Sequence, residues 1–334
     1  MRVAILQFNP TLGAVEQNLQ RATALLKTSD TTNIDLLVLP ELAFTGYNFP
    51  DLEAIKPYLE PTAAGPSTHW AIATAQREKC AVLVGYPEIH TDAIDGTTTN
   101  YNATVTVSPD GTVLNHYRKS FLYYTDETWA SEGPGPSSTS TTTIDTDHDP
   151  EQQQQPFFIG PLGTMGTVGH GICMDINPYR FTAPWSAYEF ANRMLESKTK
   201  LVILSMAWLT RLLPADLALD PDKPDMETVA YWLERLYPFL EPAPAHGIVV
   251  VFANRCGVEG NRLGSVQVED GEAVVEGDRV CYAGSSCVMR FHGGSVRMYE
   301  RKAGQVAVMG KGEEGVLVVN TAEKARVLLQ HSSA

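Results

Sequence analysis

The chain has 334 residues, of which 43% are hydrophobic and 19% are charged, values that are typical of a soluble globular protein. Its formal net charge of −14 argues against a non-specific nucleic-acid binder and against a protein that binds anionic membranes. Apolar runs fall short of the roughly 18 residues of a membrane span, and the first residues lack the layout of a secretory signal. We therefore expect a cytoplasmic protein without nucleic-acid or membrane partners.

The cysteines and histidines form no metal-binding or disulfide pattern. The five cysteines are odd in number and scattered, with no CxxC pair, which favours a reducing compartment. The eight histidines show no HExxH or other paired spacing. We therefore predict neither a metal site nor a cofactor. The cysteines are Cys80, Cys173, Cys256, Cys281 and Cys287.

Short apolar runs recur along the chain and alternate with amphipathic segments. Several runs are continuously hydrophobic, as expected of strands that helices cover. Residues 14–27 predict a helix with one apolar stripe, and residues 67–79 predict a second helix capped by Ser67. The alternation predicts an α/β fold of layered sheet and helix. The predicted strands are 3–8, 35–40, 81–86, 103–107, 167–173, 201–206, 247–254 and 285–291.

Two segments interrupt this alternation. Residues 132–156 are rich in Ser, Thr, Pro and Gln and predict a flexible loop, because they bury too little apolar surface to offset the entropy of ordering. Residues 209–246 combine prolines with an amphipathic patch and predict a helical insertion near a functional site. Strand-like runs continue on both sides of each segment. We therefore predict one domain over residues 1–325, followed by a tail at 326–334.

Three predicted strand ends carry reactive side chains. Glu41 follows a buried strand in "LLVLPELAFTGYNF", Lys119 precedes an aromatic stretch in "YRKSFLYYTDETW", and Cys173 ends the run in "GHGICMDINPYR". Such strand ends commonly carry function in α/β proteins. Each residue also has an ordinary interpretation, as a loop carboxylate, a surface lysine and a core thiol respectively. The residues alone leave both interpretations open.

His170 is an obvious candidate for a base beside Cys173, but the strand pattern argues against it. In an extended segment, residues 170 and 172 point to one face and residues 171 and 173 to the other. We therefore predict that His170 is a core histidine and that the base for Cys173 comes from elsewhere. The glycines around it do not give a GxGxxG order, so phosphate binding is not favoured.

Taken in order, "PELAFTGY", "YRKSF" and "GICMD" resemble the nitrilase or carbon–nitrogen hydrolase superfamily, and "ANRCGVEG" and "YAGSSCVM" resemble two further stretches of it. The resemblance covers residues 2 to about 320. It implies an αββα sandwich and a Glu–Lys–Cys triad. Carried over residue by residue, it implies that Glu41 is the general base, Lys119 the electrostatic stabiliser and Cys173 the nucleophile, with the backbone N–H of Met174 as an oxyanion donor.

Many members of this superfamily carry a second carboxylate seven or eight residues after the lysine. Asp126 and Glu127 both occupy candidate positions. We select Glu127 as the positioning group and keep Asp126 as the alternative.

Within the superfamily, the chain is most similar to the fungal amidases that deamidate Asn or Gln at a protein's first position. "CMDINPY", "SMAWL" and "PDMETVAYWLERLYPF" carry this resemblance. It implies a substrate peptide or protein beginning with Asn or Gln, release of ammonia through a Cys thioester, a place in an N-degron pathway, and a monomer or homodimer. The alternatives are an amidase for a small free amide, a nitrilase, and a catalytically inactive binding protein.

An N-terminal substrate carries an α-ammonium close to the reacting amide, so its pocket should offer an acid or carbonyl oxygens. Asp175 has a competing role, in which it pairs with Arg180 or with local backbone and holds the turn around Cys173. The predicted substrate contacts are Tyr47, Asn48, Asp126, Trp129, Asp175, Asn177 and Trp208, with Glu127 also a candidate for the α-ammonium.

Overall fold

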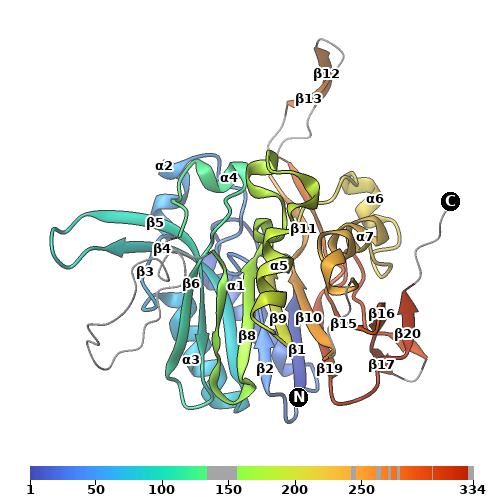
Figure 1. The fold of residues 1–334 in the computed structure, drawn as a ribbon. Coiled ribbons are helices and arrows are strands. Elements are labelled where there is room, and N and C mark those ends of the chain that lie inside the picture. The colour runs from blue at the N-terminus through green and yellow to red at the C-terminus, as the bar shows by residue number, and fades with distance from the viewer. Residues whose placement is uncertain are drawn as a thin grey trace.

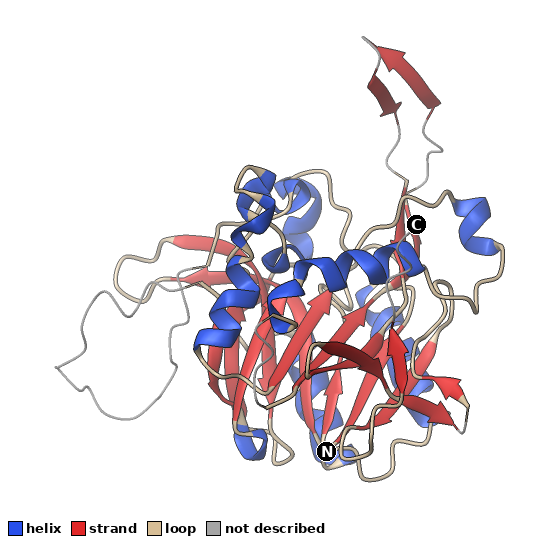
Figure 2. Ribbon diagram, turned by 45° about the vertical axis from the view of Figure 1, so that its right-hand side comes forward, coloured by secondary structure: helices blue, strands red, loops and turns tan. Residues whose placement is uncertain are grey.

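The computed structural model describes residues 1–133, 156–241, 246–260, 265–269, 272–276, 279–302 and 304–329. Two seven-stranded sheets pack face to face, and helices cover the outer face of each (Figures 1 and 2). Four layers therefore follow in the order helix, sheet, sheet, helix. This arrangement confirms the predicted αββα sandwich. Among the described residues, no helix combines the length and apolar character that crossing a membrane requires.

The first sheet has the strand order β19-β1-β2-β4-β5-β6, and β3 pairs with β4 outside this path. β1, β2 and β4 are parallel to one another, whereas β19, β5 and β6 join antiparallel to their neighbours. Its strands are β1 (Arg2–Gln7), β2 (Leu36–Val38), β3 (Glu60–Pro61), β4 (Ala81–Thr91), β5 (Thr98–Val107), β6 (Val113–Arg118) and β19 (Gly315–Asn320).

The second sheet has the order β20-β16-β15-β10-β9-β8-β7, with β8, β9 and β10 parallel at its centre. Its strands are β7 (Phe158–Pro161), β8 (Thr167–Ile172), β9 (Leu201–Met206), β10 (Ile248–Asn254), β15 (Cys287–His292), β16 (Ser295–Met298) and β20 (Val327–Leu329). Smaller pairs are β11 (Cys256–Glu259) with β14 (Val280–Ala283), β12 (Ser265–Glu269) with β13 (Glu272–Glu276), and β17 (Glu300–Lys302) with β18 (Gln305–Val306).

Three apolar cores hold the four layers together. The central core lies between the sheets, where β1 and β2 contribute Val3, Ile5 and Val38 against Val168 and Ile203 of β8 and β9. The helices α1 (Val15–Lys27) and α3 (Pro66–Glu78) pack on the first sheet. α5 (Glu189–Glu196) and α7 (Met226–Arg235) pack on the second. Shorter helices are α2 (Leu52–Ile55), α4 (Tyr124–Glu127) and α6 (Pro214–Ala218).

The structure confirms all eight predicted strands and both predicted helices, with two corrections. Ser67 does not cap α3, because the N-cap residue is Gly65 and the Glu60 carboxylate accepts the N–H and hydroxyl hydrogen bonds of Ser67. The predicted tail begins too early, because β20 pairs with β16 at the sheet edge and extends the domain to Leu329. Most of the predicted loop at 132–156 lies outside the described residues.

Candidate active site

Glu41, Lys119 and Cys173 meet at the same end of the sandwich. Glu41 follows β2, Lys119 follows β6 of the same sheet, and Cys173 follows β8 of the opposite sheet. The Lys119 ammonium donates to Glu41 Oε1 at 2.6 Å, and all three side chains are buried. The structure thus brings together the three residues that the strand-end pattern singled out.

Glu41 is fixed by close contacts with both sheets. Its Oε2 accepts the N–H of Ala207, which directly follows β9, at 2.8 Å. Gly85 of β4 passes so close that an added Cβ would lie 2.8 Å from the Glu41 Cα. A side chain at position 85 would therefore push Glu41 out of place, because atoms cannot approach at that distance without displacement.

Lys119 bridges two carboxylates. Its ammonium also donates to Asp126 Oδ2 at 2.6 Å, and the Asn102 amide donates to Glu41 Oε1 at 2.7 Å and to Asp126 Oδ1 at 3.0 Å. An ammonium has three N–H donors, and these two carboxylates take two of them. The third donor can therefore serve an oxyanion that forms beside Cys173.

The prediction that Glu127 is the second carboxylate beside Lys119 is wrong. Consecutive residues of the short helix α4 point about 100° apart, so only one of the pair can face inward. Asp126 is the buried one and also accepts the N–H of Tyr123, which caps the helix. Glu127 is exposed to solvent. The alternative, Asp126, occupies the position against Lys119.

Burial dominates the electrostatics of this cluster. It raises the pKa of Glu41, an effect that Lys119 opposes and Asp126 adds to. Burial also raises the pKa of Cys173 well above its ordinary value, and the negative charge of Glu41 acts in the same direction. Burial alone would lower the pKa of Lys119, but Asp126 and Glu41 raise it overall. Burial therefore disfavours the Cys173 thiolate and makes Glu41 a stronger base, while the two carboxylates favour the charged form of Lys119.

The backbone turns sharply at the nucleophile. β8 ends at Ile172, and Cys173 adopts a left-handed φ of 42° before a 3₁₀ turn over Cys173–Ile176. This conformation is uncommon for a residue with a side chain and persists only where its surroundings enforce it. Asp175 supplies that enforcement, because it accepts four hydrogen bonds around the turn. Its donors are the N–H groups of Ile172, Phe121 and Ser120 and the hydroxyl of Tyr117, at 2.7, 2.8, 3.1 and 2.8 Å.

These contacts give Asp175 the local backbone role rather than a substrate contact. Burial raises the pKa of its carboxyl to about 6, and the N–H donors oppose that rise. Arg180, the side chain predicted as a possible partner of Asp175, instead places its Nη2 atom 3.7 Å from Oε1 of Glu132.

His170 is a core histidine as predicted. Its ring nitrogens contact the Thr104 hydroxyl at 2.8 Å and the Ile203 carbonyl at 2.9 Å, and burial lowers its pKa to about 4.

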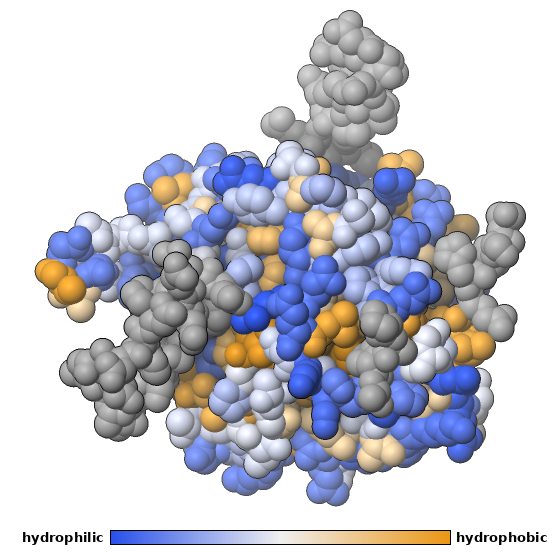
Figure 3. Space-filling view, in the orientation of Figure 1, coloured by the Kyte–Doolittle hydropathy of each residue, from blue (hydrophilic) through white to orange (hydrophobic). Residues whose placement is uncertain are grey.

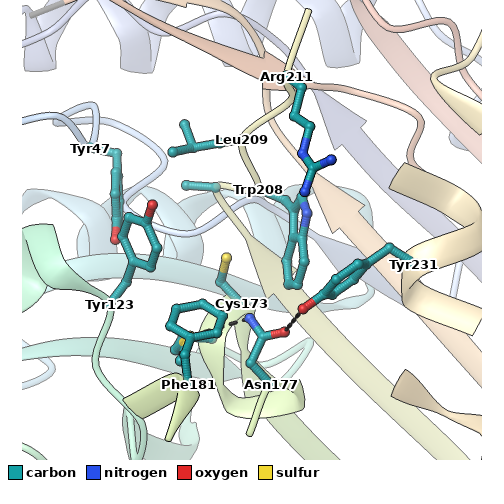
Figure 4. Close-up of a pocket in the computed structure, with 11 residues that line it drawn as sticks. Tyr47, Tyr123, Cys173, Asn177, Phe181, Trp208, Leu209, Arg211 and Tyr231 are labelled. Carbon is teal, nitrogen blue, oxygen red and sulfur yellow. Dashed lines mark hydrogen bonds between the residues drawn. The ribbon is translucent and has the colours of Figure 1, made fainter. Parts of the chain in front are cut away.

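A cavity of about 260 Å³ opens above the Cys173 thiol (Figure 4). Aromatic rings form most of its wall, and the thiol lies among them near the floor (Figure 4). The Asn177 carbonyl oxygen accepts the Tyr231 hydroxyl at 2.7 Å on one side. The lining residues are Tyr47, Tyr123, Cys173, Met174, Asn177, Phe181, Ala207, Trp208, Leu209, Arg211 and Tyr231.

Three of the predicted substrate contacts, Tyr47, Asn177 and Trp208, line the cavity, and so does Met174, the predicted oxyanion donor. The other four predicted contacts, Asn48, Asp126, Trp129 and Asp175, are not among the lining residues. The N–H of Asn48 donates to Glu259 at 2.9 Å. Trp129 belongs to the apolar cluster that contains Tyr47 and Leu42.

Sequence reasoning did not select Asn102, Tyr123, Arg211 or Tyr231 as site residues. Tyr231 lies within "PDMETVAYWLERLYPF", a stretch that carried the family resemblance, and Tyr123 lies in the aromatic stretch that follows Lys119. These stretches were the available signal. Arg211 and Tyr231 come from the predicted insertion at 209–246, so this segment does lie at the site. Among the described residues, no three or more His, Cys, Asp or Glu side chains converge as a metal site would require.

An αββα sandwich with a buried glutamate, lysine and cysteine at its strand ends defines a carbon–nitrogen hydrolase. The chain belongs to this family, because the family model described as "Carbon-nitrogen hydrolase" matches residues 2–180. It is therefore a hydrolase that acts on amide C–N bonds.

Two relatives and one solved structure resemble the chain over most of its length. The chain is 30% identical to the protein N-terminal amidase of Schizosaccharomyces pombe, over 95% of this chain and 98% of that one. It is 27% identical to the protein N-terminal amidase of Saccharomyces cerevisiae, over 72% and 64% of the two chains. A crystal structure of an N-terminal amidase with an Asn-Glu-Ala peptide superposes with a TM-score of 0.72 at 22% identity, covering 96% of this chain and 97% of that one.

Proposed function

We propose that this protein hydrolyses the side-chain amide of Asn or Gln at the first position of a peptide or protein. The observation that carries the proposal is the match to the S. pombe N-terminal amidase over nearly the full length of both chains. The products are an N-terminal Asp or Glu and ammonia. We infer that this reaction belongs to an N-degron pathway, in which the newly charged N-terminus is recognised.

In the first half of the reaction, Glu41 accepts the Cys173 proton while the sulfur attacks the amide carbon. The carbonyl oxygen becomes an oxyanion, which the third Lys119 N–H and the N–H of Met174 stabilise; one such donor typically contributes about 3 kcal/mol. Transfer of the proton during the attack fits the raised pKa of Cys173, because burial disfavours the free thiolate. Glu41 then donates the proton to the leaving nitrogen, so ammonia departs and a thioester remains.

In the second half, water replaces ammonia. Glu41 removes a proton from the water, whose oxygen attacks the thioester carbon, and the same donors stabilise the second oxyanion. Collapse breaks the C–S bond, and the proton on Glu41 returns to the sulfur. The new carboxylic acid leaves, and the thiol and the carboxylate are restored.

The cavity wall offers acceptors for the α-ammonium of such a substrate. Asp126 and Asp175 are occupied by Lys119 and by backbone donors, so neither faces the substrate. Asn177 lines the cavity, and its carbonyl oxygen has a second lone pair beyond the one that Tyr231 uses. We assign the α-ammonium to the Asn177 carbonyl and the Tyr231 hydroxyl oxygen.

A second candidate function is an amidase for a small free amide that carries a carboxylate. The observation that favours it is Arg211, the one cation among the described residues that line the cavity. A guanidinium in this wall would suit a free carboxylate as well as it suits an acidic peptide.

The deciding experiment compares an Asn-initiated peptide with its N-acetylated copy. Both peptides are also compared with small free amides that carry a carboxylate. Mass spectrometry and ammonia release are measured, with Cys173→Ala as the inactive control. The proposal expects turnover of the free-amine peptide at least about 100-fold faster than of the acetylated one, because the acetyl group removes the ammonium that the wall accepts. Equal rates on the two peptides, or faster turnover of the free amide, would overturn it.

A further inference from the structure

A second polar region lies at the end of the sandwich opposite the cavity. Ala207, at the cavity, follows β9, whereas Lys200 and Leu201 at the start of β9 line a different cleft. Six extended residues span about 20 Å, so the two sites are well separated. The strands β16 and β20 near this region appear at the lower right of Figure 1. Figure 3, drawn in the same orientation, shows that hydrophilic residues cover much of the lower part of the molecule.

Two clefts meet at this end and share Arg290 and His292. One is about 530 Å³ and the other about 440 Å³, large enough for a small molecule. The larger is lined by Arg290, His292, Gly293, Ser295, Arg297, Ala322, Glu323, Lys324 and Ala325. The smaller is lined by Met1, Lys200, Leu201, His246, Gly247, Val249, Arg290, His292 and Thr321.

The larger cleft concentrates positive charge on a strongly acidic chain. Arg290, Arg297 and Lys324 contribute three cations against one carboxylate, Glu323, whose Oε1 accepts the Asn320 amide at 3.0 Å. The whole chain carries −14. A local excess of cations against that background is a feature that solubility does not require.

The register of the strands makes this excess costly without a counter-ion. Arg290 of β15 and Arg297 of β16 stand directly opposite each other, and like charges in such cross-strand pairs repel. Within the described part of the chain, neither guanidinium forms an ion pair with a carboxylate. Arg297 donates to the Arg326 carbonyl at 3.2 Å. Arg290 lies over Gly247, where an added Cβ would come within 3.0 Å of its Nε.

We propose that these joined clefts bind a small anion with two or more phosphate or carboxylate groups. Arg290 and Arg297 present two planar forks from adjacent strands, a geometry that matches the paired oxygens of either group. Lys324 and, in the adjoining cleft, Lys200 supply point charges for a second anionic group. An anion between the two guanidinium groups relieves their repulsion, so the fold itself favours the occupied state.

The test measures binding of pyrophosphate and of citrate to the full chain by isothermal titration calorimetry at low ionic strength. We expect saturable binding of at least one, weakened at least about tenfold by Arg297→Gln, since that variant loses a charge-assisted bidentate contact. The matched control is Arg326→Gln, which removes an exposed arginine outside the cleft and should bind as the wild type does. The arm that binds more tightly identifies the ligand as a phosphate or a carboxylate.

A second readout guards against a variant that fails to fold. Ligand that binds only to the native state raises its melting temperature, so pyrophosphate or citrate should raise that of the wild type more than that of Lys324→Gln, whose side chain is exposed. Amidase activity should be unchanged in both cleft variants. The proposal would be overturned if neither anion bound, or if Arg297→Gln bound as tightly as the wild type. An equal loss of affinity in Arg326→Gln, or a loss of amidase activity in a cleft variant that has lost binding, would also overturn it.

Discussion

The floor and the wall of the catalytic cavity are built in different ways. We call the buried cluster of Glu41, Lys119 and Cys173 the floor, of which Cys173 lines the cavity. Each of the three follows a buried strand and is held by hydrogen bonds or by backbone geometry. The wall includes Arg211 and Tyr231, which come from the segment between β9 and β10 and are partly or fully exposed. The residues that we propose for bond breaking thus follow strands, whereas some of those that we propose for substrate contact come from a connecting segment.

The largest effect that this contrast predicts is at the nucleophile. Cys173→Ala removes the atom that forms the thioester, so kcat should fall at least about 10⁴-fold, as it does when other covalent nucleophiles are removed. The melting temperature should change by only a few degrees, since the small residue keeps the β8 turn. Steady-state ammonia release and a thermal melt check both. Activity within tenfold of wild type would contradict the assignment of Cys173.

The next largest effect separates two adjacent carboxylates of the floor. Asp126→Asn removes one of the two carboxylates on Lys119 and should lower kcat about 100-fold, whereas Glu127→Gln, a solvent-exposed matched control, should stay within twofold. Kinetics on an Asn-initiated peptide test this pair. Equal losses in the two variants would contradict the placement of Asp126.

The pH profile of kcat/KM for Asp126→Asn tests whether Asp126 acts on Glu41, an effect that a loss of folding would not produce. Because the pKa of Glu41 is raised, the acid limb of kcat/KM should lie above pH 4.5, and activity should fall as pH decreases through it. The negative charge of Asp126 contributes to that rise, so Asp126→Asn should move the limb to lower pH. A limb that stays in place, or moves to higher pH, would argue against this coupling.

A smaller effect is expected in the wall. Tyr231→Phe deletes the hydroxyl that contacts Asn177, so KM for Asn-initiated peptides should rise about fivefold, corresponding to roughly 1 kcal/mol for one hydrogen bond. The kcat should change less than KM, because the floor is untouched. Tyr237→Phe, on an exposed ring outside the cavity, is the control. A loss in kcat with unchanged KM would contradict a binding role.

The smallest effect should depend on the substrate's second residue. Arg211 sits on a fixed segment, because the neighbouring Thr210 hydroxyl donates to Asp225 at 2.6 Å. Arg211→Gln should lower kcat/KM for Asn-Glu peptides about threefold and raise it slightly for Asn-Lys peptides, since surface charge pairs contribute only modestly. Competition between the two peptides measures the ratio directly. A ratio that the substitution leaves unchanged would remove Arg211 from substrate selection.

The floor was predictable from sequence because each of its residues adjoins a buried strand that the apolar pattern reveals. The choice between Asp126 and Glu127 was not, because it depends on the phase of a single helical turn. Asn102 carries no local signal, since its contact with two carboxylates follows from the register of β5 beside β4 and β6. Arg211 and Tyr231 enter the cavity only through the path of the 209–246 segment, which local periodicity does not specify.

The hydrogen bonds of Asp175 have a mechanical consequence. Asp175 follows β8 of one sheet, yet it holds the N–H groups of Ser120 and Phe121, which follow β6 of the other. Glu41, which follows β2 of the first sheet, accepts a hydrogen bond from the N–H of Ala207, which follows β9 of the second sheet. This bond links the two sheets at a second point. Sliding or breathing of the two sheets would otherwise separate the lysine from the thiol. These hydrogen bonds between the two sheets oppose such motion where the reacting atoms lie.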